Sequence, residues 1–164
     1  MILVTLGTQD KKFYRLLEEI DNLLLCKKIK DKVIVQAGSS SHYKCKSKKM
    51  QIFNLIPMDE FDKLIKDCSL LITHGGVGTI LAGLKNKKKI IAVPRLARYK
   101  EHVNDHQVQI VSNFSDEEYL LKVENIKTLW NVIEYSKIFK PKEYVENNEN
   151  FLKVLEKEID KYLI

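Results

Sequence analysis

Apolar residues along the chain fall into two alternating patterns. Short runs of consecutive apolar residues are typical of strands buried on both faces, and they alternate with segments whose apolar residues recur every three or four positions, as in amphipathic helices. The predicted strands span residues 2–6, 32–37, 50–55, 69–73, 89–93 and 119–123. The predicted helices span residues 12–25, 59–67, 77–86, 103–113, 125–135 and 142–162. Asp59 is the expected N-cap of the second helix.

This order of elements predicts an α/β fold, in which helices cover both faces of a Rossmann-like, doubly wound parallel sheet. The 164 residues contain no repeat and no low-complexity linker, so we expect a single domain over residues 1–164. Within it, we expect residues 142–164 to form a C-terminal helix that either docks a partner or packs on its own domain.

Composition excludes two classes of protein. A hydrophobic content of 45% is too high for a disordered chain. No apolar run approaches the roughly 20 residues of a membrane-spanning helix. No basic segment precedes the first predicted strand, as it would in a signal peptide. We therefore expect a cytoplasmic protein.

Charge is unevenly distributed along the chain, which has a net charge of +6. Residues 27–49 carry eight lysines against one acid, and residues 85–100 carry seven basic residues and no acid. Residues 141–164 reverse the sign, with six acids against four lysines. Basic clusters of this kind suit phosphate groups, nucleic acid or an anionic membrane surface, and they are equally typical of a lysine-rich solvated surface.

Cysteine and histidine spacing indicates neither a disulfide framework nor a metal site. The three cysteines show no CxxC or Cys/His spacing, and we expect Cys26 and Cys68 to be reduced core thiols and Cys45 to be exposed. His102 and His106 are one helical turn apart and form a possible metal pair. Because no third ligand accompanies them, we expect no bound metal.

Glycine-rich turns follow two of the predicted strands. LGTQ (6–9) follows the first strand, and THGGVGT (73–79) lies between the fourth strand and its helix. Missing Cβ atoms let an anion approach the backbone N–H groups at a helix N-terminus. His74 and Thr79 add hydrogen-bonding groups, so the second turn favours a diphosphate site over a plain turn capped by His74, although it matches neither common phosphate-loop pattern. The first turn fits a phosphate site and a tight turn equally well.

A third polar segment, EHVNDHQ (101–107), follows the fifth strand and Pro94-Arg95. Six of its seven residues are polar and combine donors with acceptors, which the hydroxyl groups of a sugar ring require. Because it follows a neighbouring strand, we expect it to face the same crevice as the glycine-rich turn. An ordinary polar helix start is the alternative.

Three motifs together resemble the C-terminal, donor-binding half of GT-B glycosyltransferases of family 28. They are THGGVGT (73–79), IIAVPR (90–95) and EHVNDHQ (101–107), and the resemblance covers about residues 1–135. Within the family, this short freestanding chain looks like the PssE-type subunits of bacterial exopolysaccharide and capsule synthesis.

The resemblance implies a donor-binding role for a set of matching residues. They are Gly7, Thr8, Ile56, Met58, His74, Gly75, Gly76, Gly78, Thr79, Arg95, His106 and Gln107. Residues 74–79 would hold the diphosphate of a UDP-sugar, and residues 55–58 would wrap the uracil. His106 and Gln107 would read the hydroxyl groups of the sugar. Relatives place a ribose-binding Glu where this chain has Ala82, so ribose recognition would come from elsewhere.

The resemblance also implies an inverting transfer that uses no cofactor beyond the UDP-sugar substrate. The acceptor hydroxyl would attack the anomeric carbon, and the basic run at 85–100 together with the 74–79 turn would stabilise the leaving diphosphate. The candidates for the general base are Glu101, His102 and Asp105.

Because the resemblance covers only one half of a two-domain enzyme, it also implies a partner that supplies the other half and closes the crevice. We expect a membrane-anchored PssD-like subunit, which would supply the acceptor half and hold this chain at the inner face of the cell membrane, beside a polyprenyl-diphosphate-linked acceptor. The preferred reaction is β-1,4 transfer of galactose from UDP-galactose. The alternatives are an N-acetylglucosamine transferase subunit and a non-catalytic nucleotide- or nucleic-acid-binding module. No nucleic-acid partner is expected, because basic strands interleaved with aromatic residues are missing.

Overall fold

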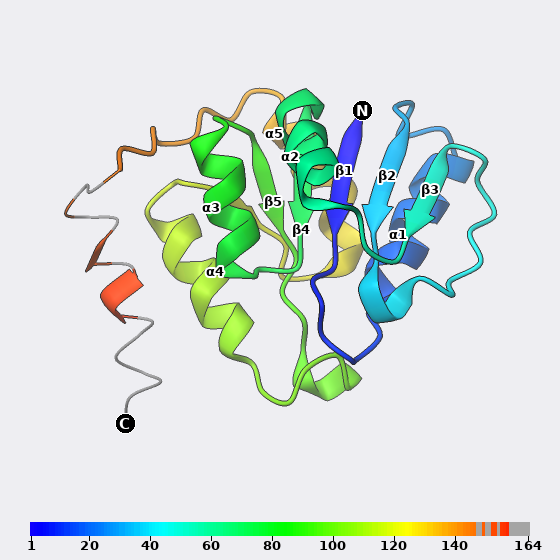
Figure 1. Ribbon diagram of the computed structural model, residues 1–164, viewed down its shortest axis with the longest axis horizontal. Helices are drawn as coiled ribbons and strands as arrows, with labels where there is room; N and C mark the ends of the chain where they lie inside the picture. Colours follow the sequence, from blue (N-terminus) through cyan, green and yellow to red (C-terminus); the bar gives the residue numbers. More distant parts are fainter. Residues whose placement is uncertain (147–148, 150–151, 154, 158–164) are drawn as a thin grey trace.

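The computed structural model describes residues 1–146, 149, 152–153 and 155–157. Six parallel strands form one sheet in the order β3-β2-β1-β4-β5-β6 (Figure 1). The strands are β1 (Ile2–Thr5), β2 (Val33–Gln36), β3 (Met50–Phe53), β4 (Leu70–Thr73), β5 (Ile90–Ala92) and β6 (Leu121–Lys122). Thr5 is paired with both Gln36 and Thr73, so the three central strands end level with one another. The predicted parallel α/β fold is confirmed.

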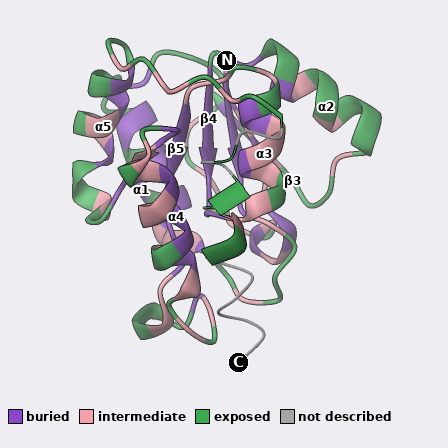
Figure 2. Cartoon of the chain, turned by 90° about the vertical axis from the view of Figure 1, so that its left-hand side faces the viewer, coloured by how far each residue is buried: buried purple, intermediate pink, exposed green. Residues whose placement is uncertain are grey.

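Helices cover both faces of the sheet. They are α1 (Tyr14–Leu25), α2 (Met58–Asp67), α3 (Val77–Lys85), α4 (His106–Asp116) and α5 (Leu129–Ser136), with short 3₁₀ helices η1 (Gly38–Ser40), η2 (Ala97–Tyr99) and η3 (Ile126–Thr128). Apolar residues of α1 and α5 form one core with the sheet, and those of α2, α3 and α4 form the other. Figure 2 shows the buried residues concentrated along the strands and on the inward sides of the helices.

The continuous apolar runs of the strands supply both cores. Successive residues of a strand point to opposite faces, so Val4 and Ile72 belong to the core beneath α1 and α5, whereas Leu3 and Leu71 belong to the other. All four side chains are completely buried. This two-sided burial explains why the strands could be predicted from unbroken apolar segments.

The sixth strand is shorter than predicted because its first residues serve the end of α4. Glu118 has a left-handed backbone (φ 61°), and the Tyr119 N–H donates to the carbonyl oxygen of Phe114 at 3.0 Å. This geometry closes the helix C-terminus. Tyr119 and Leu120 are buried in the core on that side of the sheet, so their apolar character reflects helix packing and not strand pairing.

Two helices begin at positions that differ from the predictions. α2 starts at Met58 after the N-cap residue Pro57, so the prediction of Asp59 as N-cap is wrong, and Asp59 lies in the first turn. There its carboxylate is near the positive end of the helix dipole. α4 starts at His106 and not at residue 103, because the Asn104 side chain accepts a hydrogen bond from the His106 N–H. Short polar side chains compete with helix formation in this way.

The chain after β6 differs from the two helices predicted for it. Residues 125–135 divide into η3 and α5 (Leu129–Ser136), and the Asn125 side chain accepts from the Lys127 N–H at this start. Residues 142–145 are not helical, whereas residues 149, 152–153 and 155–157 are. The remainder of the predicted helix lies outside the described residues. Tyr144 and Leu155 pack against the core formed by α2, α3 and α4, which favours packing of this segment on its own domain.

The cysteines differ in part from expectation. Cys26 is exposed, because it follows the last turn of α1, and Cys45 is half-buried with its Sγ 3.5 Å from the carbonyl oxygen of Met50. Only Cys68 is a buried core thiol, and burial raises its pKa. In the described part of the chain, no helix is both long and apolar enough to cross a bilayer.

Candidate functional site

A groove lies at the carboxyl ends of the central strands, where the chain turns to opposite sides of the sheet. From β1 the chain proceeds to β2 on one side, and from β4 it proceeds to β5 on the other. Open α/β sheets bind ligands at such a point. The groove has a volume of about 420 Å³ and is lined by Gly7, Thr8, Gln9, Gln36, Leu55, Ile56, Met58, Phe61, His74, Gly76, Gly78 and Thr79.

Eight of the twelve predicted donor-binding residues line this groove together: Gly7, Thr8, Ile56, Met58, His74, Gly76, Gly78 and Thr79. The other four, Gly75, Arg95, His106 and Gln107, do not line it. Gly75 is buried with φ 97°, and a Cβ atom on it would lie 2.7 Å from Cγ2 of Val111 in α4. Its missing side chain therefore allows α4 to pack against the turn.

The imidazole of His74 determines where glycine is needed in the groove. A Cβ atom added to Gly7 or to Gly76 would lie 2.5 Å from His74 Nε2, closer than non-bonded atoms approach. Gly7 also has φ 73°, a left-handed conformation that side chains disfavour. The turns after β1 and β4 therefore meet at one histidine ring, with two glycine backbones beside its Nε2 edge.

Burial and a neighbouring cation keep His74 uncharged. Desolvation, followed by the positive charge of Arg95, lowers the pKa of His74 to about 4. Its Nδ1 lies 3.3 Å from the Thr5 carbonyl oxygen and 3.4 Å from Thr73 Oγ1. If Thr73 donates to Nδ1, the proton is on Nε2, which can then donate to an anion in the groove. If Nδ1 donates to Thr5, Nε2 is an acceptor.

The N-terminus of α3 supplies further donors to the groove. Its N-cap residue, Gly76, has no capping side chain, and Gly78 and Thr79 of the first turn line the groove. The first N–H groups of a helix have no acceptor within the helix. With the helix dipole they form an anion site, and the hydroxyl group of Thr79 adds another possible donor.

One wall of the groove is apolar and comes from the segment between β3 and α2 and from the first turn of α2. Leu55 and Met58 are 61% and 72% exposed, although both are large apolar side chains, and Phe61 is half-buried beside them. The Ile56 N–H donates to Gln36 Oε1 at 2.8 Å. An apolar wall next to an anion site suits a ligand with a flat organic group joined to phosphates.

Sequence reasoning missed Gln9, Gln36 and Phe61 as groove residues. Gln36 was the last polar position of a predicted strand, and polar residues at the carboxyl ends of strands are the signal that would have identified it. The 38–41 turn also borders this region, since a Cβ atom on Gly38 would lie 2.5 Å from the Gly7 carbonyl oxygen.

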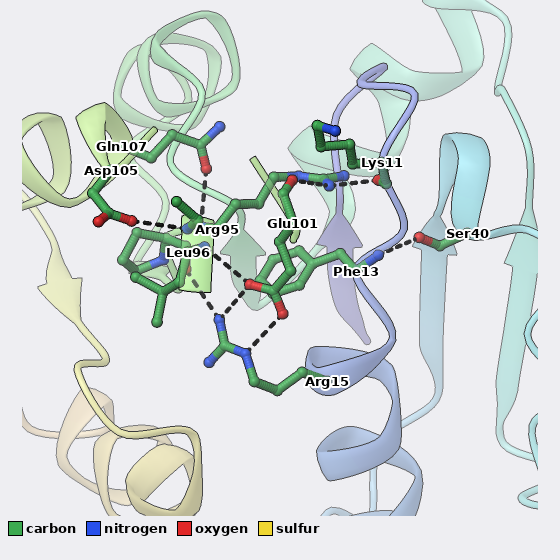
Figure 3. A network of polar contacts seen from close by, with 11 residues as sticks. Lys11, Phe13, Arg15, Ser40, Arg95, Leu96, Glu101, Asp105 and Gln107 are labelled. Atoms are coloured by element: carbon green, nitrogen blue, oxygen red, sulfur yellow. Dashed lines mark hydrogen bonds and ion pairs between the residues drawn. The ribbon is translucent and has the colours of Figure 1, made fainter. Parts of the chain in front are cut away.

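Arg95 connects the loop after β1 to the loop after β5 (Figure 3). The side chain is completely buried. Nη2 donates to the Leu6 carbonyl oxygen at 2.6 Å, and Nη1 donates to the carbonyl oxygens of Lys11 and Glu101 at 2.6 and 3.1 Å. The guanidinium also lies 5.1 Å from the centre of the Phe13 ring. Desolvation lowers the pKa of Arg95 to about 10, so it remains a cation at neutral pH.

Glu101 is committed to the same network and is therefore a poor candidate for the general base. Its two carboxylate oxygens accept hydrogen bonds of 2.9 and 2.8 Å from Arg15 in α1, and Oε2 also accepts from the Leu96 N–H at 3.0 Å (Figure 3). The side chain is almost completely buried. A carboxylate whose two oxygen atoms are held by a bidentate arginine has little freedom to move toward a substrate.

Three other polar residues of the 101–107 segment, His102, Asp105 and Gln107, bind the backbone between β5 and α4. Gln107 is buried, and its Oε1 accepts from the Arg95 N–H at 3.0 Å, while Asp105 accepts from the Ala97 N–H at 2.8 Å. His102 is half-buried, with Nδ1 accepting from the Asn104 N–H at 3.3 Å. The prediction that this segment faces the same groove is wrong, because none of residues 101–107 lines the groove. Gln107, Asp105 and His102 instead accept hydrogen bonds from backbone N–H groups between β5 and α4.

The basic run at 85–100 is divided between the two ends of the sheet, because β5 lies inside it. Lys88 and Lys89 precede β5 and donate to backbone carbonyls at the ends of α2 and α5. Lys87 pairs with Glu143 on the surface. These lysines are at the amino end of the sheet, away from the groove, so the expectation that the whole run stabilises a leaving group there is wrong. Arg95 is the cation of this run nearest the turns that form the groove.

The part of the chain that the structure describes contains no group of three or more His, Cys, Asp or Glu side chains placed to hold a metal ion. The groove itself presents the first backbone N–H groups of α3 and the dipole of this helix, which are features that can bind an anion.

The parallel sheet and its covering helices define a Rossmann-like α/β class of domain. The family model of the glycosyltransferase family 28 C-terminal domain matches residues 1–161. The chain therefore belongs to this family of glycosyltransferase domains, as the sequence motifs predicted.

Solved structures show the same fold. The solution structure of ALG13 is 17% identical, with a TM-score of 0.60 over 94% of this chain and 93% of that chain. UDP-GlcNAc 2-epimerase from Methanocaldococcus jannaschii, in complex with UDP-GlcNAc and UDP, is 16% identical (TM-score 0.63, 98% of this chain and 45% of that one). MurG from Acinetobacter baumannii is 15% identical (TM-score 0.55, 83% and 42%). The chain thus spans less than half of the last two proteins. No curated protein sequence matches it.

Proposed function

We propose that this chain is the donor-binding, catalytic subunit of a two-component inverting glycosyltransferase. It would transfer a hexose from a UDP-sugar to a lipid-linked sugar in the synthesis of a capsular or extracellular polysaccharide. Galactose from UDP-galactose, transferred in β-1,4 linkage, is the preferred donor and reaction. The single observation that supports the proposal is the groove that His74, the two glycine turns and the start of α3 line together.

The diphosphate of the donor would lie against Gly7, Gly76 and the first turn of α3. Its negative charge would be stabilised by the helix dipole, by His74 with its proton on Nε2, and by the buried charge of Arg95. Such preorganised donors do for a leaving diphosphate what a metal ion does in other enzymes. No cofactor other than the donor substrate is required by this arrangement.

The uracil would lie against the apolar wall of Leu55, Ile56, Met58 and Phe61. The sugar would extend from the diphosphate toward the start of α4, where His106 is half-exposed. We retain His106 as the candidate reader of the sugar hydroxyls. Gln107 would act indirectly, because its carbonyl oxygen is engaged by the Arg95 N–H.

The general base would come from the partner subunit. In the transfer step, the acceptor hydroxyl attacks the anomeric carbon, the bond to UDP breaks, and the hydroxyl proton passes to a base. Glu101 and Asp105 already accept hydrogen bonds from this chain, and neither they nor His102 line the groove. A second subunit over the open groove would exclude water and position both acceptor and base.

That partner would be a membrane-anchored, PssD-like subunit presenting a polyprenyl-diphosphate-linked acceptor, and it would hold this chain at the inner face of the cell membrane. Docking through residues 142–164 is one route. The apolar side chains exposed around the groove, including Phe53, Leu55 and Met58, offer another.

Isothermal titration calorimetry of the purified chain with UDP, UDP-galactose, UDP-N-acetylglucosamine and an oligonucleotide tests the proposal. We expect binding of UDP and tighter binding of one UDP-sugar, with transferase activity appearing when the partner is added. Tighter binding of UDP-N-acetylglucosamine would select the alternative donor. Binding of the oligonucleotide without binding of UDP would contradict the proposal and favour a nucleic-acid-binding module at the lysine-rich end of the sheet.

A further inference from the structure

We propose that Gln36 reads the nucleobase and selects a pyrimidine with a keto group at position 4, as in uracil. This inference rests on the proposed function of the groove and adds a specificity-determining residue to it. Gln36 is the last residue of β2, next to β1 in the sheet, and its side chain lines the groove with Leu55, Ile56 and Phe61.

The orientation of the Gln36 carboxamide is fixed by its neighbour. The Ile56 N–H donates to Gln36 Oε1 at 2.8 Å. A backbone N–H can meet only an acceptor, so this contact identifies the oxygen end of the amide, and the NH₂ group must point to the other side. Within the described residues Nε2 makes no hydrogen bond, and it is not among the buried polar atoms without a partner. The groove therefore contains an oriented donor that is open to a ligand.

The surroundings of this donor suit a planar base. The apolar side chains of Leu55, Met58 and Phe61 provide surface for the faces of an aromatic ring. The anion site around Gly7 and Gly76 takes the phosphates, which leaves the wall beside Gln36 for the base. A pocket with apolar walls and few oriented polar groups is the usual form of a specific small-molecule site.

Hydrogen-bond chemistry then separates the pyrimidines. The O4 atom of uracil accepts a hydrogen bond from Gln36 Nε2, whereas cytosine carries an amino group at this position and would place donor against donor. A glutamine often escapes such a conflict by rotating its amide by 180°. Here rotation would turn the NH₂ group toward the Ile56 N–H, so the backbone of Ile56 prevents it. Leaving the donor unpaired beside a bound base weakens binding.

Calorimetric titration with UDP and with CDP tests the inference in the wild type, Gln36→Glu, Gln36→Met and the control Gln9→Glu. We expect the wild type to prefer UDP by about tenfold or more. Gln36→Glu keeps an acceptor for the Ile56 N–H but replaces the donor, so the preference should disappear or reverse. Gln36→Met should also lose the preference. Gln9→Glu places the same charge in the same groove and should weaken both ligands while keeping their ratio.

Equal affinity of the wild type for UDP and CDP, or a UDP preference unchanged in Gln36→Glu and Gln36→Met, would overturn the inference and leave the proposed function standing. Failure of the wild type to bind either nucleotide would instead contradict the proposed function, and the inference with it. As a second readout that needs no variant, the Gln36 side-chain amide signals in ¹⁵N NMR should shift with UDP. Unmoved signals at saturating UDP would also overturn the inference.

Discussion

His74 occupies the space that a side chain on Gly76 would require, since a Cβ atom at position 76 would lie 2.5 Å from Nε2 of the ring. The same ring excludes a side chain at Gly7 on the neighbouring strand end. Two turns far apart in sequence are thus matched to one imidazole. The need for glycine at positions 7 and 76 therefore follows from packing against His74 as much as from any binding of phosphate there.

The contact predicts opposite effects of alanine at two neighbouring glycines. Gly76→Ala should lower the melting temperature, because the added Cβ atom would clash with the His74 ring. The backbone of Gly76 (φ −69°) suits alanine without strain, so the clash is the main cost. Gly78→Ala is the control: no atom lies within 4 Å of its Cβ position, and alanine in a helix is worth about 0.5–1 kcal/mol over glycine. Thermal denaturation measures both.

A double variant separates this clash from a general effect of the substitution. His74→Ala should remove most of the cost of Gly76→Ala, so the two changes should be strongly non-additive. Equal melting temperatures for Gly76→Ala and Gly78→Ala, or additive losses in the double variant, would show that the ring is not where the structure places it.

The stability of the protein should fall in mild acid because of His74. Its pKa is about 4 in the folded chain and 6.5 in the unfolded one, so between these values the unfolded state binds more protons. Stability from this group is therefore complete above about pH 6.5 and decreases by about 3 kcal/mol as the pH falls to about 4. Urea denaturation from pH 7 to 4 measures the slope.

The matched variant for this pH effect is His74→Asn, which has no titrating ring. Its stability should fall less steeply over the same range than that of the wild type. UDP should also flatten the wild-type slope, since an anion beside Nε2 favours the protonated ring. Parallel pH profiles for the wild type and His74→Asn would rule out a buried neutral histidine.

Arg95 should matter for stability and for nucleotide binding without touching the ligand. Arg95→Met removes the hydrogen bonds to Leu6, Lys11 and Glu101, and we expect a loss of about 2–4 kcal/mol together with weaker UDP binding. Arg98→Met, an exposed arginine of the same loop, should change stability by less than about 0.5 kcal/mol. Chemical denaturation and calorimetry give both quantities; similar results for the two variants would disprove the role of Arg95.

His106 and Gln107 should behave differently, although the sequence pairs them. Gln107→Ala leaves the Arg95 N–H without its acceptor, so it should weaken UDP and a UDP-sugar by similar factors and lower stability. His106→Ala should weaken the UDP-sugar more than UDP. Calorimetry with both ligands distinguishes them. If Gln107→Ala affected only the sugar, its side chain would have to leave the position it has in the free chain.

The sequence was sufficient to predict the sheet and the turns that form the groove. The unbroken apolar segments of the strands and the glycines around His74 are local signals, because each can be read from a short stretch of the sequence. The division of the 85–100 run could also have been predicted, since the predicted strand at 89–93 lies inside it and must carry the chain from one end of the sheet to the other.

The roles of buried polar residues could not be predicted in the same way. Arg95 and Glu101 are polar residues that the sequence places beside a ligand, but the structure shows them occupied by Leu6, Lys11 and Arg15, which come from distant positions. A polar residue that is buried for structural reasons and one that binds a ligand have the same composition and spacing in the sequence. Only the tertiary contacts determine which backbone groups need those side chains.

The most direct test of the groove as a UDP-sugar site is a ¹⁵N NMR titration of the free chain with UDP. We expect the largest shifts on the backbone amides of Gly7, Gly76 and Gly78, in the turns after β1 and β4. Shifts confined to the lysines at 27–32 and 85–89, at the other end of the sheet, or no shifts at millimolar UDP, would contradict it.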